Sequence, residues 1–372
     1  MAGWKFLAEG VILAVFLLTT TWASSIDERH SIHLSENEPD NSEFALHNLE
    51  RIANEMLDAK RHGRPSRMAS QNPFLKHLAC DPHAKFRTID GTCNNLLHPW
   101  RGAAKTPLIR MSPQRYQDGF NSPRIMYHYS KDMLPSARRV SLEIHHTTSN
   151  ISNDHSHLLM NWGQFIDHDI TLSPESGSEG GEEINKTRCC EFLSNTDNLH
   201  ECFPISTSYD PVYRQGCIPF LRSAPIPGLP NQPVLRYQMN DLTSFIDGSM
   251  VYGSTKLKSD ALRSFKGGKL LSKISRNEEI LPDEKSNPRD CFHSEQECRY
   301  AAGDVRNSEQ AGLTSIHTLL LRTHNKIASA LEELNSHWSD ERLYQTTRKI
   351  VGAIIQRITY KEFCLWSLDQ GT

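Results

Sequence analysis

The sequence lacks a strong charge of either sign, and it has no internal repeat and no low-complexity tract. Lysine and arginine total 41 against 44 acidic residues, for a net charge of −3. This balance argues against a nucleic-acid partner and against a solvated acidic tail. Beyond the N-terminal region, no apolar run is long enough to span a bilayer. With 37% hydrophobic residues in 372, the chain can bury one large core or two modest ones, so we expect function to come from a folded site.

The N-terminus has the pattern of a secretory signal peptide. Lys5 precedes the apolar run Val11–Leu18, and the small residues that follow suit cleavage after Ala23. We therefore predict a signal peptide over residues 1–23 and a secreted, extracellular protein, with an uncleaved anchor as the alternative. Residues 24–78 are polar, with one amphipathic helical pattern and a basic end, and are a candidate propeptide or linker.

Nine cysteines in an exported chain are expected mostly to form disulfides. Four pairs are expected: Cys80 with Cys93, two pairs among Cys189, Cys190, Cys202 and Cys217, and Cys291 with Cys298, which leaves Cys364 over. A zinc site is the weaker alternative, because the spacings are irregular and no paired C-x-x-C occurs. Glycosylation sequons at Asn150 and Asn185 fit the same oxidising, extracellular setting.

Apolar residues recur at helical spacing near the C-terminal end of the sequence. This pattern predicts long helices over residues 312–334 and 340–363. Residues from Cys80 onward are instead rich in proline and glycine, and no strand alternation of useful length occurs. We therefore predict a mainly α domain over residues 79–372, with long loops pinned by disulfides.

The stretch WGQFIDHDIT, residues 162–171, concentrates polar side chains on one short helix. If residues 160–170 are helical, Gln164, Asp167 and His168 share one face, while Asp169 points about a quarter-turn away. One face could line a pocket while the neighbouring carboxylate binds something else.

A second stretch, LTSFIDGSMVYGS, offers oxygen ligands at alternate positions. Thr243, Asp247 and Ser249 have side-chain oxygens and Phe245 a backbone carbonyl, and alternate residues of an extended loop point the same way. Together with Asp169, these oxygens are a candidate calcium site. The alternative interpretation is an ordinary hydrogen-bonded turn.

A third stretch places Arg306 and Glu309 just before the helix predicted at 312–334. Taken alone, the two residues are typical of a first-turn charge pair in which Glu309 helps to cap the helix.

In this order, the three stretches resemble the animal haem peroxidases. The likeness also covers GTCNNLLHPWRGAAKTPLIRM, YQDGFNSPR, CIPFLRSAP and ERLYQTTRKIVGAIIQRITYKEF, so it extends from about Cys80 to Phe363. It implies that family's helical fold, a haem b cofactor and hydrogen peroxide as substrate.

The resemblance also implies a role for each candidate residue. His168 matches the distal histidine, a general base for peroxide, and Arg306 the distal arginine, whose permanent charge would stabilise the peroxide as its O–O bond breaks. Gln164 matches the distal glutamine, which holds water or halide. Asp167 and Glu309 match the carboxylates that form ester links to haem.

The resemblance further matches the candidate oxygen ligands to the family's calcium site, whose ligands here are Asp169, Thr243, Phe245, Asp247 and Ser249. Because Asp169 directly follows His168, a bound calcium would hold the distal helix in place. Position 310 departs from the myeloperoxidase branch, since Gln310 stands where that branch has a methionine that links to haem. A third covalent link is therefore not expected.

Family members ligate the iron through a proximal histidine that lies well downstream of ITYKEF. His317, His324 and His337 do not match it, so we expect the chain to be C-terminally incomplete and to hold the distal half of the domain. The leading hypothesis is a secreted haem peroxidase that oxidises a halide, a pseudohalide or a phenolic donor.

Two other functions compete with this one. The first is a non-catalytic, exported, calcium-stabilised binding or adhesion module, or a truncated isoform, with an extracellular matrix or cell-surface partner. The second is a hydrolase using His168 and Asp167, which is disfavoured because no serine or cysteine nucleophile motif accompanies them.

Overall fold

The computed structural model describes residues 78–365, except 109, 111, 113, 128–131, 146–154, 177–188, 192–200, 209, 215, 227–235 and 285–299. The expectations for residues 1–23, for nearly all of 24–78, for Asn150 and Asn185 and for Cys291 with Cys298 lie outside the described residues. No helix among the described residues has the length and apolar character needed to cross a membrane.

Helices dominate the described part, which confirms the predicted fold class. The longer ones are α3 (Ala137–Ile144), α4 (His157–Ile170), α7 (Ala311–Leu334) and α8 (Asp340–Ile358). The shorter ones are α5 (Ser249–Tyr252), α6 (Lys256–Ala261), the 3-10 turn η5 (Val305–Ser308) and the π turn η6 (Thr359–Phe363). The helix predicted over 340–363 therefore ends as a π turn.

The strands are short and lie outside the helical core. Among the described residues there are three antiparallel pairs: β1 (Thr106–Pro107) with β4 (Met239–Asn240), β2 (Ile205–Ser206) with β3 (Cys217–Ile218), and β5 (Lys273–Ser275) with β6 (Glu278–Ile280). Strands of two or three residues leave no room for an alternating pattern, which is why the sequence displays none.

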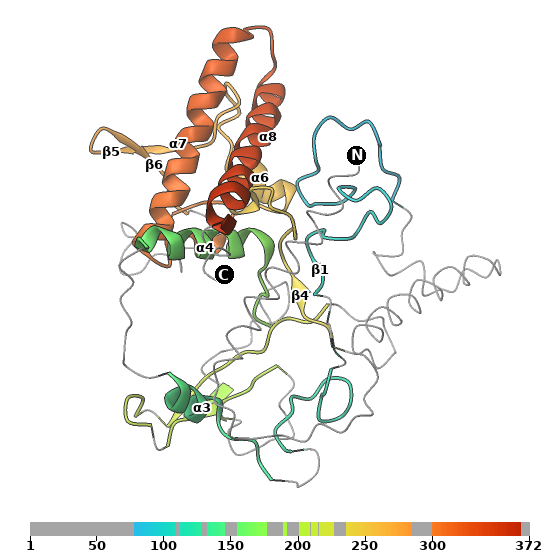
Figure 1. The fold of residues 1–372 in the computed structure, drawn as a ribbon, viewed down its shortest axis with the longest axis vertical. Coiled ribbons are helices and arrows are strands. Elements are labelled where there is room, and N and C mark those ends of the chain that lie inside the picture. The colour runs from blue at the N-terminus through green and yellow to red at the C-terminus, as the bar shows by residue number, and fades with distance from the viewer. Residues whose placement is uncertain are drawn as a thin grey trace, which may run out of the picture.

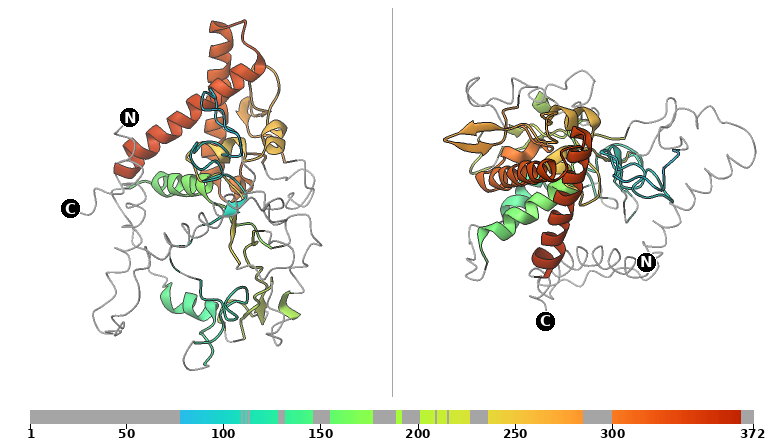
Figure 2. Two further views of the ribbon diagram at one scale, coloured as in Figure 1. Left: turned by 90° about the vertical axis from the view of Figure 1, so that its right-hand side faces the viewer. Right: turned by 90° about the horizontal axis from the view of Figure 1, so that it is seen from above.

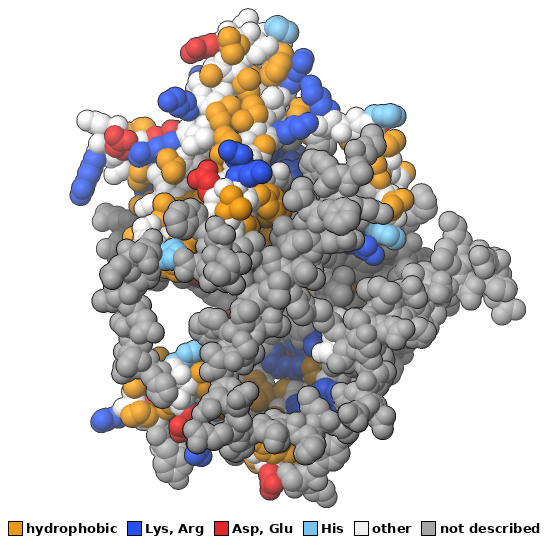
Figure 3. Space-filling view, viewed as in Figure 1, with side chains coloured by type: hydrophobic (Ala, Val, Ile, Leu, Met, Phe, Trp, Pro, Cys, Tyr) orange, Lys and Arg blue, Asp and Glu red, His pale blue; other side chains and the backbone are white. Residues whose placement is uncertain are grey.

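The core forms where α4 crosses the hairpin of α7 and α8, with α5 packed beside it (Figures 1 and 2). Phe165 of α4, Leu313 of α7 and Ile355 of α8 are each 0% exposed in this cluster. Ser339 caps α8 by accepting a hydrogen bond from Arg342 N at 3.3 Å. In the space-filling view, hydrophobic side chains lie among charged ones on the upper part of the molecule, and several Lys and Arg side chains are visible in a hollow of the lower half (Figure 3).

Three disulfides fasten the loops. Cys80 is bonded to Cys93 as predicted. Among the four clustered cysteines the structure selects one connectivity, Cys189 with Cys202 and Cys190 with Cys217. Among the described residues, Cys364 takes part in no disulfide, and its side chain is half-buried. The loops are thus pinned by disulfides, as the cysteine spacing predicted.

Candidate functional site

The α4 helix buries His168 beside two charged groups. The side chain of His168 is 5% exposed, and its Nε2 lies 4.0 Å from Oε2 of Glu309. Its Nδ1 is buried and has no hydrogen-bond partner. Burial, and to a lesser degree the charge of Arg306, holds the pKa of His168 below 6.5, so the imidazole is neutral at pH 7 and can accept a proton.

Arg306 of η5 lies against the C-terminal end of α4. Its Nη2 donates to the backbone oxygens of Thr171 at 2.9 Å and His168 at 3.4 Å, and to Oδ2 of Asp304 at 2.7 Å. Those helix carbonyls and the buried Asp304 carboxylate both favour a cation there, so the guanidinium is fixed next to His168. Asp304 was not among the predicted site residues, although an aspartate two residues before Arg306, whose N–H it accepts at 2.7 Å, is a recognisable N-cap signal.

A hydrogen-bonded row of side chains joins α4 to the start of α7. Gln164 donates from Nε2 to Oε2 of Glu309 at 3.0 Å, and Gln310 donates from Nε2 to Oε1 of Gln164 at 3.0 Å and to Oδ1 of Asn161 at 2.7 Å. Gln310 also caps α7 by accepting from Gly312 N at 2.8 Å. Gln310, which stands where the myeloperoxidase branch has a methionine, therefore orients the amide of Gln164.

Glu309 and Asp167 remain open to solvent. The Glu309 side chain is 50% exposed, and Asp167 is exposed on α4 one residue before His168. The site thus combines a buried neutral imidazole, an unpartnered Nδ1, a fixed cation and two accessible carboxylates. This donor set fits one side of a haem, with the carboxylates available for attachment.

The candidate calcium ligands form a second buried cluster behind α4. Asp169 is 0% exposed and Asp247 1%. Oδ2 of Asp169 accepts hydrogen bonds from Asp247 N and Gly248 N at 3.1 Å, and its Oδ1 accepts one from Ser249 Oγ at 2.7 Å. The Thr243 hydroxyl lies 3.1 Å from both oxygens of Asp247.

The loop that holds these ligands is bent, which corrects the expectation of an extended segment. Phe245 lies in the bend, and its ring packs so closely on Gly102 that a Cβ there would come within 2.8 Å of it. Gly248 has φ +83°, a left-handed conformation that suits glycine, and it turns the chain so that Ser249 begins α5. Turns, rather than strand alternation, bring the oxygens of this loop together.

Two buried carboxylates lie close together here, although hydrogen bonds from the loop and the charges of Arg87 and Arg348 partly offset the cost of burying them. Burial and then the charge of Asp247 raise the pKa of Asp169, and burial likewise raises that of Asp247 against the opposing charge of Arg87. Adjacent buried acids with neighbouring hydroxyls are the hard-oxygen set that calcium favours. The geometry therefore fits a cation bound by this cluster.

The remaining histidines of the α7 region have other surroundings. His317 is buried edge-on against Phe165, with ring centroids 5.1 Å apart, and His324 is bonded to Tyr252 and Gly268. His337 is exposed in the loop after α7. Within the described ranges, no group of three or more His, Cys, Asp or Glu residues could hold a metal ion.

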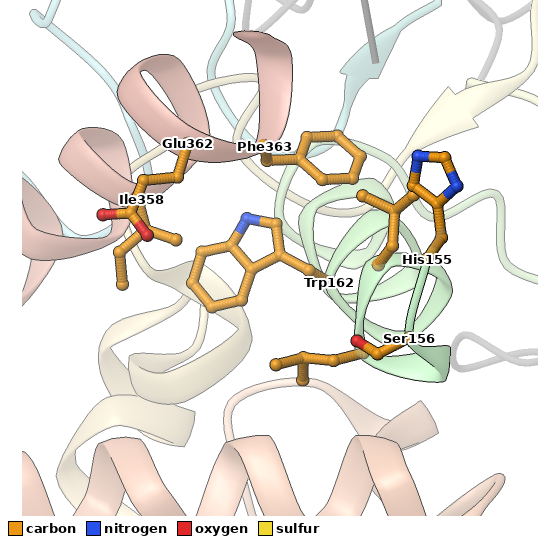
Figure 4. Close-up of a pocket in the computed structure, with 8 residues that line it drawn as sticks. His155, Ser156, Trp162, Ile358, Glu362 and Phe363 are labelled. Carbon is orange, nitrogen blue, oxygen red and sulfur yellow. The ribbon is translucent and has the colours of Figure 1, made fainter. Parts of the chain in front are cut away.

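A groove of about 320 Å³ lies between the start of α4 and η6. Figure 4 shows the Trp162 indole between Ile358 and Glu362 on one side and His155 on the other, with Phe363 above. Trp162 Nε1 donates to Thr359 Oγ1 at 3.3 Å and ties α4 to the π turn. The groove does not include His168 or Arg306, so it is separate from the polar site.

Comparisons with known proteins point to one family. The sequence matches the animal haem peroxidase family over residues 86–371. It is 39% identical to a peroxidasin homolog of Mus musculus over 76% of this chain and 20% of that protein. It is 36% identical to myeloperoxidase of Homo sapiens over 77% of this chain and 40% of that protein. The chain thus spans between a fifth and two fifths of the length of these curated relatives.

Solved structures agree on the fold. Peroxidase A from Dictyostelium discoideum superposes with a TM-score of 0.60 at 26% identity, covering 75% of this chain and 53% of that one. A fatty acid alpha-dioxygenase from Arabidopsis thaliana superposes with a TM-score of 0.55 at 21% identity, covering 75% of this chain and 37% of that one. At 21% identity, the similarity to the dioxygenase supports the fold alone.

Proposed function

Because this chain belongs to the animal haem peroxidase family, we propose that it provides the peroxide-binding side of a haem peroxidase site. The reaction would reduce hydrogen peroxide and oxidise a halide, a pseudohalide or a phenolic donor. The observation that carries the proposal is the buried His168, with a neutral imidazole held between Arg306 and Glu309. When bound, the haem iron would supply the electrons that reduce the peroxide.

The residues of this chain would handle the proton and the charge. His168 takes a proton from one peroxide oxygen and returns it to the other, which departs as water. Arg306 stabilises the negative charge that develops as the O–O bond breaks, and its pairing with Asp304 keeps it in position. Gln164, held by Gln310, orients water or a halide.

Two carboxylates would attach the cofactor, haem b. Asp167 and Glu309 are both accessible and are the proposed ester-forming residues. Asp169, Thr243, the Phe245 carbonyl, Asp247 and Ser249 are proposed to hold calcium behind the same helix. Secretion is proposed from the signal-peptide pattern and from the three disulfides, which persist in oxidising compartments.

The proposal is tested in a version of the protein that includes the region expected to carry the proximal histidine. This version is loaded with haem and calcium, freed of loose haem, and assayed for peroxide reduction. The variant His168→Ala is expected to lose about two to four orders of magnitude in rate, because proton transfer loses its base. The matched control His337→Ala changes an exposed loop histidine and should behave as the parent does. Activity of His168→Ala within about tenfold of the parent would rule out the assigned role.

The mode of haem attachment has its own measurement. A Soret band that survives a denaturing gel is expected in the parent, and it should weaken when Glu309→Gln removes one ester-forming carboxylate. If this 372-residue chain, loaded in the same way, retains no haem at all, the chemistry belongs to a longer product, and this polypeptide is either a fragment or the binding module.

A further inference from the structure

A second pocket, remote from the polar site of α4, gathers four arginines. It has a volume of about 450 Å³, within the range of roughly 300–1,000 Å³ typical of small-molecule sites. Its arginines are Arg110, Arg115, Arg124 and Arg222, and its aromatic walls are Tyr116, Phe203 and Phe220. None of the described residues that line it is acidic.

Within the part of the chain that the structure describes, the half-buried guanidinium of Arg110 forms hydrogen bonds to neutral groups. Its Nη2 donates to Tyr116 Oη at 2.9 Å and to Gln238 Oε1 at 2.6 Å, and its Nε is buried without a partner. Arg138 and Arg263, by contrast, are paired with carboxylates. A partly desolvated cation without a counter-charge is unfavourable, so Arg110 favours an anion in the pocket.

The other arginines reinforce this charge. Arg222 is buried, and its Nη2 donates to the Asn121 carbonyl at 2.6 Å. Exposed Arg124 donates from Nε to the Met126 carbonyl at 3.2 Å. The guanidinium carbons of Arg110 and Arg222 lie 5.5 and 6.0 Å from the centre of the Tyr116 ring. Cation–π contacts with one ring therefore hold two cations in place before any ligand binds.

Two acidic residues lie near Arg222, and each has other hydrogen-bond partners. Glu201 lowers the cost of burying Arg222 but is bonded to Arg236 at 2.7 Å. Asp118 accepts hydrogen bonds from the backbone N–H groups of Phe120, Asn121 and Ser122. Both carboxylates lie outside the lining of the pocket.

We propose that this pocket binds an organic anion in which a sulfate or phosphate monoester is attached to an aromatic ring. Guanidinium groups pair in two-pronged fashion with tetrahedral oxyanions, and Arg110 and Arg222 provide two prearranged cations. Phe203 and Phe220 provide the surface that an aromatic group packs on. The site requires no haem and is independent of the proposed peroxidase activity.

Isothermal titration calorimetry of the full chain tests the proposal with phenyl sulfate, phenyl phosphate, phenol and inorganic sulfate at constant ionic strength. The two esters are expected to bind, phenol not to bind, and inorganic sulfate to compete more weakly. Arg110→Gln should weaken ester binding by about tenfold or more, because a hydrogen bond to a charged group is lost. Equal affinity for phenyl sulfate and inorganic sulfate would refute the aromatic part of the proposal.

Two further variants keep the test decisive. Arg139→Gln removes the same charge from an exposed position on α3 and should leave binding unchanged. Arg124→Gln alters an exposed lining residue and should weaken ester binding even if Arg110→Gln fails to fold. The proposal is overturned if the parent binds neither ester, or if Arg124→Gln binds them as tightly as Arg139→Gln does.

Discussion

Acid should destabilise this protein through a histidine that is locked in its neutral form. His324 is 0% exposed in α7. Its Nε2 lies 2.9 Å from the Gly268 carbonyl, which can only accept, so Nε2 carries the hydrogen. Its Nδ1, 2.8 Å from the Tyr252 hydroxyl, therefore accepts from that group. Burial lowers the pKa of His324 from 6.5 to about 4.

The sign of the effect follows from which state binds the proton. Between about pH 6.5 and about pH 4 the unfolded chain protonates this histidine and the folded chain does not, so stability falls as the pH falls through this window. The difference between the two pKa values corresponds to about 3 kcal/mol of unfolding free energy. The loss of unfolding free energy due to His324 is absent above about pH 6.5 and complete below about pH 4.

Urea unfolding across this pH window measures the effect. In the variant His324→Gln, the drop in unfolding free energy between the two ends of the window should be about 3 kcal/mol smaller than in the parent. His337→Gln, which changes an exposed histidine, should reproduce the drop seen in the parent. His317, also buried with a pKa of about 4, contributes to both proteins, so the comparison isolates His324. An identical drop in His324→Gln and the parent would refute the reasoning.

Three other changes should alter stability by predictable amounts. Calcium at a hundredfold excess over its dissociation constant should raise the unfolding free energy by about 2.7 kcal/mol, and Asp247→Asn should remove the response to EDTA in a thermal melt. Arg263→Met should cost about 1–3 kcal/mol, because its 5% exposed side chain binds two carboxylates at the start of α8. Ile355→Ala, at a fully buried position, should cost about 2–5 kcal/mol in urea unfolding.

Each of these changes has a matched comparison. Lys256→Met removes the cation of an exposed ion pair and should change stability by less than about 1 kcal/mol, in contrast to Arg263→Met. Ala353→Ser alters an exposed position of α8 and should be nearly neutral beside Ile355→Ala. A calcium response that Asp247→Asn retains in full would place the binding site elsewhere.

The sequence predicted α7 and α8 well because their apolar residues face one core, whereas α3, α5 and α6 were not predicted. Leu313, Ile316 and Leu320 recur at helical spacing, and all three are buried in α7. The connectivity of the four clustered cysteines was not predictable, since neighbouring residues such as Cys189 and Cys190 allow several pairings at similar loop lengths. The π turn after Ile358 was also missed, because its composition continues the helical pattern.

The candidate site could be predicted only in part from the sequence. The spacing in α4 correctly separated Asp169 from His168, since successive helical residues point about 100° apart. Gln164 and Glu309 are hydrogen-bonded although they lie far apart in the chain. From the sequence, only the resemblance to the haem peroxidases placed them in one site. Gln310 was noted as a departure from one branch, but its hydrogen bond to Gln164 depends on packing that no local pattern encodes.

The turn of α4 at residues 167–169 explains how one short stretch serves three environments. Asp167 faces solvent, His168 is buried beside Arg306, and Asp169 is buried against the loop that begins α5. Because these residues share one rigid helical turn, a displacement of Asp169 also displaces His168. The hydrogen bonds of Ser249 to both the carboxylate and the carbonyl of Asp169 therefore fix the position of the imidazole as well. Loosening the acidic cluster should consequently displace the imidazole of His168, together with Asp167 on the same helical turn.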